Sequence, residues 1–433
     1  MPRSPADPLR ATILAWVALA GLLVAAQQSW AAGAWRPVVA SAMFVVLVYA
    51  GGVAVSLPER LAVRVVVLGG VGLQALALRV RPWSTDDFLR YVWDGRVLLS
   101  GVNPYRYPPG DPALAALRDP WLFPDGQMPA LNHPTERTIY PPIAQAFFGG
   151  AEALPGGDGR GLVLQALLAV VAILTSLMII SARRAQGRDP RRVIWWAWCP
   201  TVILEAGGNA HIDTLAALFV VGAVMAAARH RSVWSGLLVG LATGTKLTPV
   251  LVGLALPPRW WVRAGAAAVV VVVLGYLPFA SGGVDVTGFL RGYAGEEATD
   301  RWDLLRPLLP DAIVPAVGLG LLVLLALSIS AGWWHSLTST VDRAAALLGG
   351  TWLLLTPAYP WYFLPLVALV ALGATRLWLL PCAAAYVVYA AADLGHTYYL
   401  TRVIAYGGAA AALVLAGWRA ERTARARDGA GSR

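Results

Sequence analysis

Two adjacent carboxylates, Asp86 and Asp87, are the side chains of this sequence best placed to do chemistry. They belong to a polar stretch, residues 84–96, that follows an apolar run ending near Val80. A carboxylate at a membrane surface can act as a general base when burial or a neighbouring acid raises its pKa. Acidic side chains also cap the first turn of a helix. Both roles stay open here, and they are compatible if each acid takes one of them.

Arginines and aromatic residues follow the two carboxylates closely. Arg90 and Arg96 could bind phosphate, because guanidinium forks match phosphate oxygens, or they could pair with nearby carboxylates such as Asp94. Tyr91 and Tyr105 could stack on a sugar. An aromatic belt at the membrane interface would explain these rings without any ligand.

A second set of candidates lies further along the chain. Lys246 stands in an apolar run, where an ionisable side chain is costly unless it faces a cavity or a partner. It could neutralise a lipid phosphate, or its stem could reach the cytoplasmic surface. His211 and Asp213 lie in a turn between two apolar runs and could contact a sugar or orient a phosphate. Trp361 and Tyr362 accompany a late helix break and suit a lipid or sugar groove, or an interface anchor.

The elements that position these residues are membrane helices. The chain has 433 residues, 58% hydrophobic and 13% charged, against roughly 45–50% and 25% in soluble domains. The net charge of +10 comes from arginines in short clusters between apolar runs, which is the positive-inside pattern and not a nucleic-acid surface. We therefore expect an all-α polytopic membrane protein that does not bind nucleic acid.

The apolar runs predict about twelve transmembrane helices, the longer of which have the roughly 20 residues that cross the hydrocarbon core. They are residues 11–30, 37–56, 61–80, 161–181, 193–207, 213–228, 261–280, 312–332, 343–356, 359–373, 377–393 and 403–417.

Two further apolar segments are predicted not to cross as single helices. Residues 232–256 have arginines beyond both ends, and polar and proline residues at 243–249 interrupt them, which favours a re-entrant or kinked helix. A crossing at residues 140–154 would put the arginines of residues 183–192 outside, so we expect a surface-lying or partly inserted element there.

These assignments predict one membrane domain with both termini in the cytoplasm. Residues 1–80 hold the first spans, residues 81–160 form a large outer loop with surface helices, and residues 161–418 hold the remaining spans. Residues 419–433 form a cytoplasmic tail whose last dozen or so residues we expect to be disordered.

Several short strings carry a resemblance to one group of enzymes. In the outer loop they are residues 85–96 (TDDFLRYVWDGR), 101–105 (GVNPY), 132–134 (NHP) and 138–145 (TIYPPIAQ); later they are 211–216 (HIDTLA), 240–249 (GLATGTKLTP) and 360–362 (PWY). They resemble bacterial GT-C glycosyltransferases, and within these the polyprenyl-phosphate-mannose-dependent mannosyltransferases. The chain departs from the commonest layout of that group by additional spans before the outer loop.

The resemblance implies a GT-C-type bundle and inverting transfer of a sugar, mannose in that group, from a polyprenyl-phosphate donor to a glycan or glycolipid acceptor. The site would face outward from the cytoplasmic (inner) membrane. The base would be an aspartate of the first outer loop, Asp87 in first place and Asp86 in second. The substrate-binding residues implied are Arg90, Tyr91, Asp94, Arg96, Asn103, Tyr105, Asn132, Tyr140, His211, Asp213, Lys246, Trp361 and Tyr362.

No cofactor is expected. The sequence has no phosphate-binding loop, its histidines show no metal-ligand spacing, and the two cysteines lie in apolar runs; the need for a divalent metal stays open. The expected partners are membrane lipid, the lipid-linked donor and the acceptor. A transporter or flippase of a lipid-linked sugar is the alternative, because broken helices and an intramembrane lysine also occur in transporters.

Overall fold

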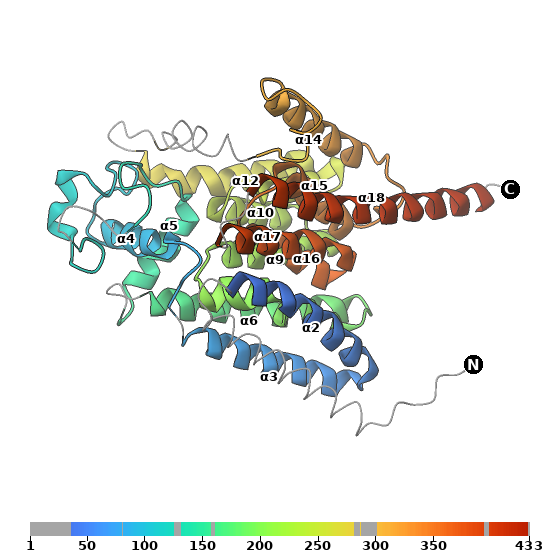
Figure 1. Cartoon of the computed structure of the whole chain (residues 1–433), viewed down its shortest axis with the longest axis horizontal. Helices are drawn as coiled ribbons and strands as arrows, with labels where there is room; N and C mark the ends of the chain where they lie inside the picture. The colour runs from blue at the N-terminus through green and yellow to red at the C-terminus, as the bar shows by residue number, and fades with distance from the viewer. Residues whose placement is uncertain are drawn as a thin grey trace.

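A computed structural model describes residues 36–79, 81–124, 131–156, 161–280, 286, 301–393 and 398–431. Within these residues the fold is helical and has no strand, as the apolar runs predicted. Figure 1 shows most helices running along the long axis, with the shorter α4 (Asp87–Leu99) and α5 (Pro142–Glu152) at one end. The other helices of the bundle are α2 (Arg36–Ser56), α3 (Glu59–Ala77), α6 (Leu162–Ala185), α9 (Asp213–Ala228), α10 (Ser232–Thr245), α12 (Trp261–Tyr276), α14 (Val314–Ser330), α15 (Thr340–Leu355), the short α16 (Leu364–Leu372), α17 (Leu379–Asp393) and α18 (Tyr398–Gly431).

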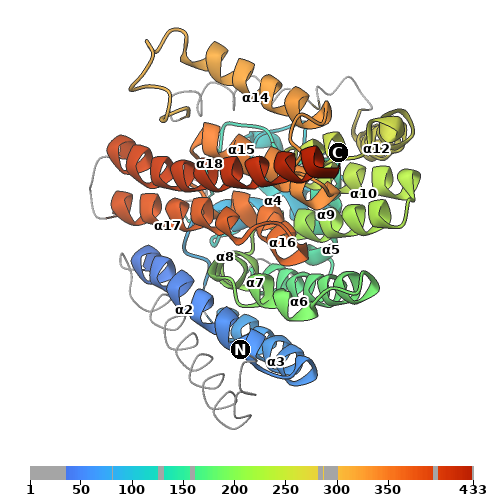
Figure 2. The same cartoon turned by 90° about the vertical axis from the view of Figure 1, so that its right-hand side faces the viewer.

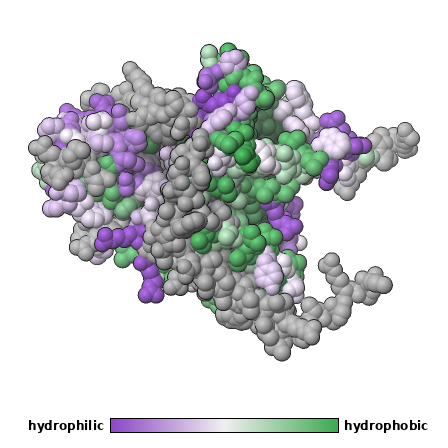
Figure 3. All heavy atoms as spheres, in the orientation of Figure 1, coloured by the Kyte–Doolittle hydropathy of each residue, from purple (hydrophilic) through white to green (hydrophobic). Residues whose placement is uncertain are grey.

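The body of the bundle has the apolar surface of a membrane protein. Four of the described helical segments are long and apolar enough to cross a membrane: Glu59–Ala77, Leu162–Ala185, Pro258–Phe279 and Tyr399–Ala426. Figure 3 shows hydrophobic side chains across the middle of one face, between a hydrophilic lobe and hydrophilic patches at the far end. The predicted span 11–30 lies outside the described residues, and the number of twelve spans stays a prediction.

Helix α16 is the centre of the bundle. All its residues from Leu364 to Leu372 are buried, and it packs against α9, α15 and α7 (Ile194–Ala197). Figure 2 shows α2 and α3 on one side of it and α14 on the other. A helix that is hydrophobic all round gains most from complete burial, which explains why this short segment is the core.

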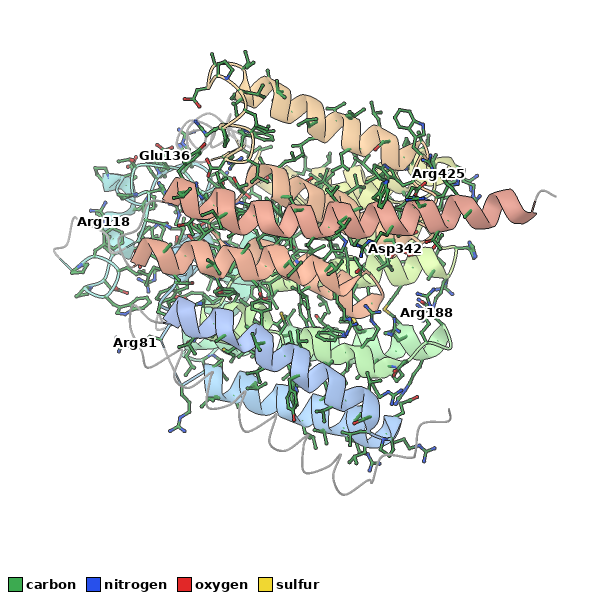
Figure 4. The ribbon with its side chains drawn as sticks, turned by 45° about the vertical axis from the view of Figure 1, so that its right-hand side comes forward. Arg81, Arg118, Glu136, Arg188, Asp342 and Arg425 are labelled. Atoms are coloured by element: carbon green, nitrogen blue, oxygen red, sulfur yellow. The ribbon has the colours of Figure 1, made fainter. Side chains whose placement is uncertain are left out.

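The arginines expected on the cytoplasmic side gather at the end of the bundle away from α4 and α5. Arg191 donates to the carbonyls of Val55 and Leu57 at 2.9 Å, at the end of α2. Arg183 donates to the carbonyl of Leu372 at 2.7 Å, at the end of α16. These cations satisfy carbonyl groups that a helix C-terminus leaves free. Figure 4 shows Arg188, Asp342 and Arg425 at this end, and Arg81, Arg118 and Glu136 at the other.

Three glycines, spaced four residues apart, bring α10 close to two neighbours. A Cβ on Gly236 would lie 2.2 Å from the carbonyl oxygen of Ala264 in α12, and one on Gly244 would lie 2.7 Å from Ile143 in α5. The middle glycine, Gly240, also faces α12. Small residues at this spacing let helix backbones approach one another in a membrane. Helix α10 thereby positions its own C-terminal end against α5.

Gly236→Ala is expected to lower the unfolding temperature in detergent, because the added methyl group forces α10 and α12 apart at a cost of about 1–3 kcal/mol. Gly265→Ala in α12 is the matched control, since nothing lies within 4 Å of its Cβ position. Equal unfolding temperatures for the two variants would contradict the close packing of α10 on α12.

The predicted interruption after α10 is present. Lys246 has an extended backbone, with φ −149° and ψ 142°, and only the short helix α11 (Val250–Leu254) follows before Pro258. The chain then returns toward the arginine-rich end, where Leu256 packs with Ala227 and Ala264. The helix break is therefore confirmed, while its depth in the membrane, and so its re-entrant character, stays a prediction.

The expectation of one continuous helix at 193–207 is wrong, while a crossing of the membrane by this segment stays a prediction. The chain there forms α7, the short α8 (Pro200–Val202) and a π-helical turn, η4 (Ile203–Gly208). The break has a local cause, because Pro200 lacks an N–H group and holds Cys199 in an extended conformation. The buried Gln74 supports the π-helical turn by accepting from the Gly207 N–H at 3.0 Å. π-Helical turns occur frequently at functional sites.

The expected disorder of the last dozen or so residues is not seen as far as Gly431, where α18 ends; residues 432 and 433 lie outside the described residues. Glu421 accepts hydrogen bonds from the backbone N–H groups of His335 and Ser336, at 3.2 and 3.0 Å. Arg425 donates to the same carboxylate at 2.9 Å, one helical turn further on. These contacts and the i, i+4 ion pair explain why the polar end of the chain remains helical.

Candidate active site

A pocket opens at the α4 and α5 end of the bundle. Four segments line it: the start of α4, the loop before α5, the break after α10, and the turn before α16. The lining residues are Thr85, Asp87, Arg90, Asn132, His133, Glu136, Arg137, Ile139, Tyr140, Lys246, Tyr359, Trp361 and Tyr362. Carboxylates, cations and aromatic rings thus share one cavity.

Asp87 is the first residue of α4 and reaches the pocket with a partly exposed side chain, 17% accessible. The amide of Asn132 donates to its Oδ1 at 2.8 Å. Its backbone N–H donates to the hydroxyl of Thr85 at 3.2 Å. Asp87 is therefore held on one oxygen by a neutral donor, so its second oxygen can accept a proton.

Asp86 lies outside the pocket lining and its side chain is largely exposed. It occupies the N-cap position of α4, but its carboxylate makes no capping hydrogen bond, so the expected capping role is wrong. Thr85 takes the backbone N–H of Asp87 instead. Partial burial, and then the charge of Asp87, raise the pKa of Asp86.

Asp94 and Arg90 form a buried pair that holds the loop before α5 against α4. The Arg90 Nε donates to Asp94 at 3.1 Å, and its terminal nitrogens donate to the carbonyls of His133 and Glu136 at 3.2 and 2.8 Å. Asp94 also accepts from Thr138 and from the Gln145 amide. The pair places the segment that carries Asn132, and each of the three Arg90 guanidinium nitrogens already donates one hydrogen bond to protein.

Four other predicted binding residues, all from the outer loop, lie outside the pocket lining. Arg96 pairs with Asp119 at 2.5 Å, and Asn103 donates to the Phe279 carbonyl at 2.7 Å. Tyr105 donates to the Tyr140 carbonyl at 2.7 Å. The buried ring of Tyr91 stacks on Phe148 with centroids 4.5 Å apart. These side chains join the outer loop to α5 and α12 and act as its framework.

Lys246 points into the pocket, at the end opposite the arginine clusters. Its ammonium lies 3.3 Å from the buried carboxylate of Asp213. It also lies 5.1 Å from the ring centroid of Tyr362 and 5.8 Å from that of Tyr140, within cation–π range. A charged group in this position is supported on three sides while it remains accessible from the cavity.

His211 is buried behind the pocket wall. Its ring stacks on Trp361, with centroids 3.9 Å apart and planes 9° from parallel. Its Nε2 lies 3.4 Å from the Thr85 hydroxyl and 4.0 Å from Asp87 Oδ2. The structure therefore brings Asp87, Asn132, Tyr140, His211, Asp213, Lys246, Trp361 and Tyr362 together, from segments far apart in the sequence.

Several residues of the site were not predicted. Arg137 and Tyr359 line the pocket. A single arginine in a polar loop gives no distinctive signal, whereas Tyr359 belongs to the same aromatic helix break as Trp361 and Tyr362, which was expected to suit a lipid or sugar groove or to anchor the interface. Glu205 did give a signal in the sequence, because it is the single charged residue of the run 193–207. A charge inside an apolar segment is a functional hypothesis by default.

A family model described as glycosyltransferase family 87 matches residues 138–357, half of the chain. The match includes α5, the break at Lys246 and the helices up to α15, while the aspartates of the outer loop precede it. Searches of the curated proteins and of the solved structures returned no match. With its apolar helices and this match, the chain belongs to glycosyltransferase family 87 and is a membrane glycosyltransferase.

Proposed function

We propose that this glycosyltransferase is inverting and moves mannose from a polyprenyl-phosphate donor to a glycan or glycolipid acceptor, on the outer face of the cytoplasmic membrane. The observation that supports this most directly is the pocket itself. An accessible carboxylate, Asp87, shares it with the cations Lys246 and Arg137. Such a pocket offers a proton acceptor for a hydroxyl group and positive charge for a phosphate.

In this proposal Asp87 is the general base. Its free oxygen accepts the proton of the acceptor hydroxyl while the hydroxyl oxygen attacks the anomeric carbon. The bond from that carbon to the phosphate oxygen breaks on the opposite face, and the configuration inverts. Polyprenyl phosphate leaves with the bonding electrons as a stable anion, so the reaction needs no second carboxylic acid.

The cations of the pocket would stabilise the leaving phosphate. Charge-assisted bonds to a phosphate act where negative charge develops. Arg137, in the loop before α5, is exposed at the pocket. Lys246 lines the pocket from the break after α10. Arg90, which the resemblance suggested for this task, is assigned mainly to positioning, because each of its three guanidinium nitrogens already donates to protein. The rings of Tyr140, Tyr359 and Tyr362 would pack against the sugar.

Lys246→Met is expected to weaken donor binding about tenfold or more, because a hydrogen bond to a charged group contributes about 1.5–3 kcal/mol. The measurement is the affinity for a polyprenyl-phospho-sugar in detergent. Lys246→Arg should retain most of the affinity. The double variant Lys246→Met with Asp213→Asn removes the effect of an unpaired buried Asp213. Unchanged affinity in both Met variants would exclude Lys246 from phosphate binding.

We place the α4 and α5 end outside and the arginine-rich end in the cytoplasm, with about twelve spans between them and both termini inside. Loops and chain ends that are rich in arginine are preferentially retained on the cytoplasmic side of the membrane. A reporter enzyme fused after Arg427 is therefore expected to be active only in the cytoplasm. An active reporter outside the membrane would reverse the proposed sidedness of the site.

Transfer from labelled polyprenyl-phospho-mannose by the purified protein tests the function. We expect labelled sugar in the acceptor and free polyprenyl phosphate as the second product. Polyprenyl-phosphate donors carrying glucose, galactose or arabinose test the choice of sugar. A transporter would move the donor across a vesicle membrane without breaking the sugar–phosphate bond, and that outcome would contradict the proposal.

A further inference from the structure

Glu205 is a fully buried carboxylate that the proposed transfer mechanism does not use. It lies in the π-helical turn η4 with an exposed fraction of 0%. A buried charge is costly unless several donors surround it. Tyr386 of α17 donates to its Oε1 at 2.6 Å, and the amide of Asn209 donates to its Oε2 at 3.0 Å. The third neighbour of this carboxylate is His211.

The contact with Glu205 bears on which nitrogen of His211 carries the proton. Nδ1 lies 2.9 Å from Glu205 Oε2, but its ring N–H direction is not aligned for a hydrogen bond to a described group. Because a carboxylate oxygen and a bare ring nitrogen repel at this distance, the relay inferred below takes Nδ1 as the nitrogen that carries the hydrogen in the neutral ring. Nε2 is then the basic nitrogen, and it points toward Thr85 and Asp87, at 3.4 and 4.0 Å.

The surrounding residues hold this arrangement rigidly. Trp361 stacks flat on the His211 ring and sets its plane. Asn209, which donates to Glu205, also accepts from the backbone N–H groups of Trp83 and Ser84 at 3.0 and 3.3 Å. The Glu205 cluster is therefore connected directly to the segment that precedes Asp87.

We propose that Glu205, His211 and Asp87 form a proton relay, in which Glu205 is a positioning residue and His211 takes from Asp87 the proton that Asp87 removes from the acceptor. The proposal rests on the proposed function, because it takes Asp87 as the base. The groups of the described residues that face the relay are the phenol of Tyr91, the Tyr386 hydroxyl, and the charges of Asp86, Asp213 and Lys246.

The proton balance of the relay is closed. The acceptor hydroxyl gives its proton to Asp87 Oδ2 as the new sugar–oxygen bond forms and the sugar–phosphate bond breaks. The Asp87 side chain then closes the 4.0 Å gap to hydrogen-bond reach, about 3 Å, and passes the proton to His211 Nε2. The imidazolium lies between two carboxylates, Asp87 and Glu205, and its proton leaves to water after the products depart.

The relay also predicts a spectroscopic result that can be measured without the sugar donor. In protein labelled with ¹⁵N-histidine, His211 is expected to carry its proton on Nδ1. The chain has five histidines, and His211→Gln identifies the signal. A neutral ring protonated on Nε2 in the wild type would overturn the relay, whatever donor the protein uses.

Kinetics test the role of Glu205 itself. Glu205→Gln keeps an oxygen for the Nδ1 hydrogen but removes the charge that stabilises the imidazolium, so kcat should fall about 10–100-fold, as for other groups that orient a histidine. The KM for the donor should stay unchanged. His211→Gln should give a similar loss of kcat. A wild-type kcat in Glu205→Gln would overturn the proposal.

Gln74→Met separates positioning from simple support of the π-helical turn. Gln74 hydrogen-bonds the Gly207 N–H in this turn and the Val202 carbonyl just before it, and it makes no hydrogen bond to Glu205 or His211 among the described residues. The Gln74→Met substitution should lower the unfolding temperature and leave kcat near the wild-type value. An equal loss of kcat in Gln74→Met and Glu205→Gln would show that Glu205 is only structural. A different result would contradict only the proposed donor. In that case the wild-type protein would carry the His211 proton on Nδ1 but would not transfer sugar from polyprenyl-phospho-mannose.

Discussion

Asp87→Asn is expected to lower the rate of sugar transfer about 10²–10⁴-fold, the contribution typical of a general base. The amide keeps the size of the side chain and its contact with Asn132, but it cannot accept a proton from the acceptor hydroxyl. Asp87 is partly exposed, so the fold does not depend on its charge. The unfolding temperature and the donor bound to the purified protein should therefore stay close to those of the wild type.

Asp86→Asn is the matched control for that experiment. It removes the same charge one residue earlier, from a side chain outside the pocket lining that makes no capping hydrogen bond. It should keep most of the transfer activity. Mass spectrometry of co-purified lipids shows whether both variants retain a polyprenyl-phospho-hexose. Normal transfer by Asp87→Asn, with activity lost in Asp86→Asn, would exchange the roles of the two aspartates.

Asp94→Ala is expected to be the most destabilising substitution in the outer loop. It leaves the Arg90 guanidinium buried without its carboxylate and removes the acceptor of Thr138 and Gln145. Breaking a buried ion pair in this way costs about 3–5 kcal/mol. We expect a large fall in the unfolding temperature, and activity lost together with the folded protein.

Asp119→Ala is the control for Asp94→Ala, because it also removes the carboxylate of an arginine pair in the outer loop. Asp119 has a side chain 33% exposed; it pairs with Arg96 and accepts from the backbone N–H groups of Trp121 and Leu122. Because its carboxylate is more exposed than that of Asp94, the unfolding temperature of Asp119→Ala should fall less than that of Asp94→Ala. If Asp94→Ala were as stable as Asp119→Ala, the Arg90 and Asp94 pair would not be what holds the loop.

The two aspartates of α4 show why sequence spacing cannot assign roles. Asp87 and Asp94 both belong to the polar string of residues 84–96, and both were predicted to meet substrate. Asp94 is 2% exposed and bound by three partners, whereas Asp87 opens into the pocket. The difference comes from the loop before α5, which covers one carboxylate and leaves the other accessible.

Features that depend on local sequence could be predicted from the chain alone. The apolar runs indicated a helical membrane protein, since a helix satisfies its own backbone within lipid. Threonine, glycine and proline around Lys246 predicted the break after α10. The clusters of arginine indicated which segment ends lie together. The strings of the outer loop identified the enzyme class through their resemblance to GT-C glycosyltransferases.

What a polar side chain does was decided by tertiary structure. Asn132 reaches Asp87 across 45 residues of chain, and Tyr386 reaches Glu205 across 181. The charge of a side chain is visible in the sequence, but its burial and its partners depend on helices that meet only in the folded bundle. Those two quantities determine whether a carboxylate supports the fold, orients a histidine or is free to accept a proton.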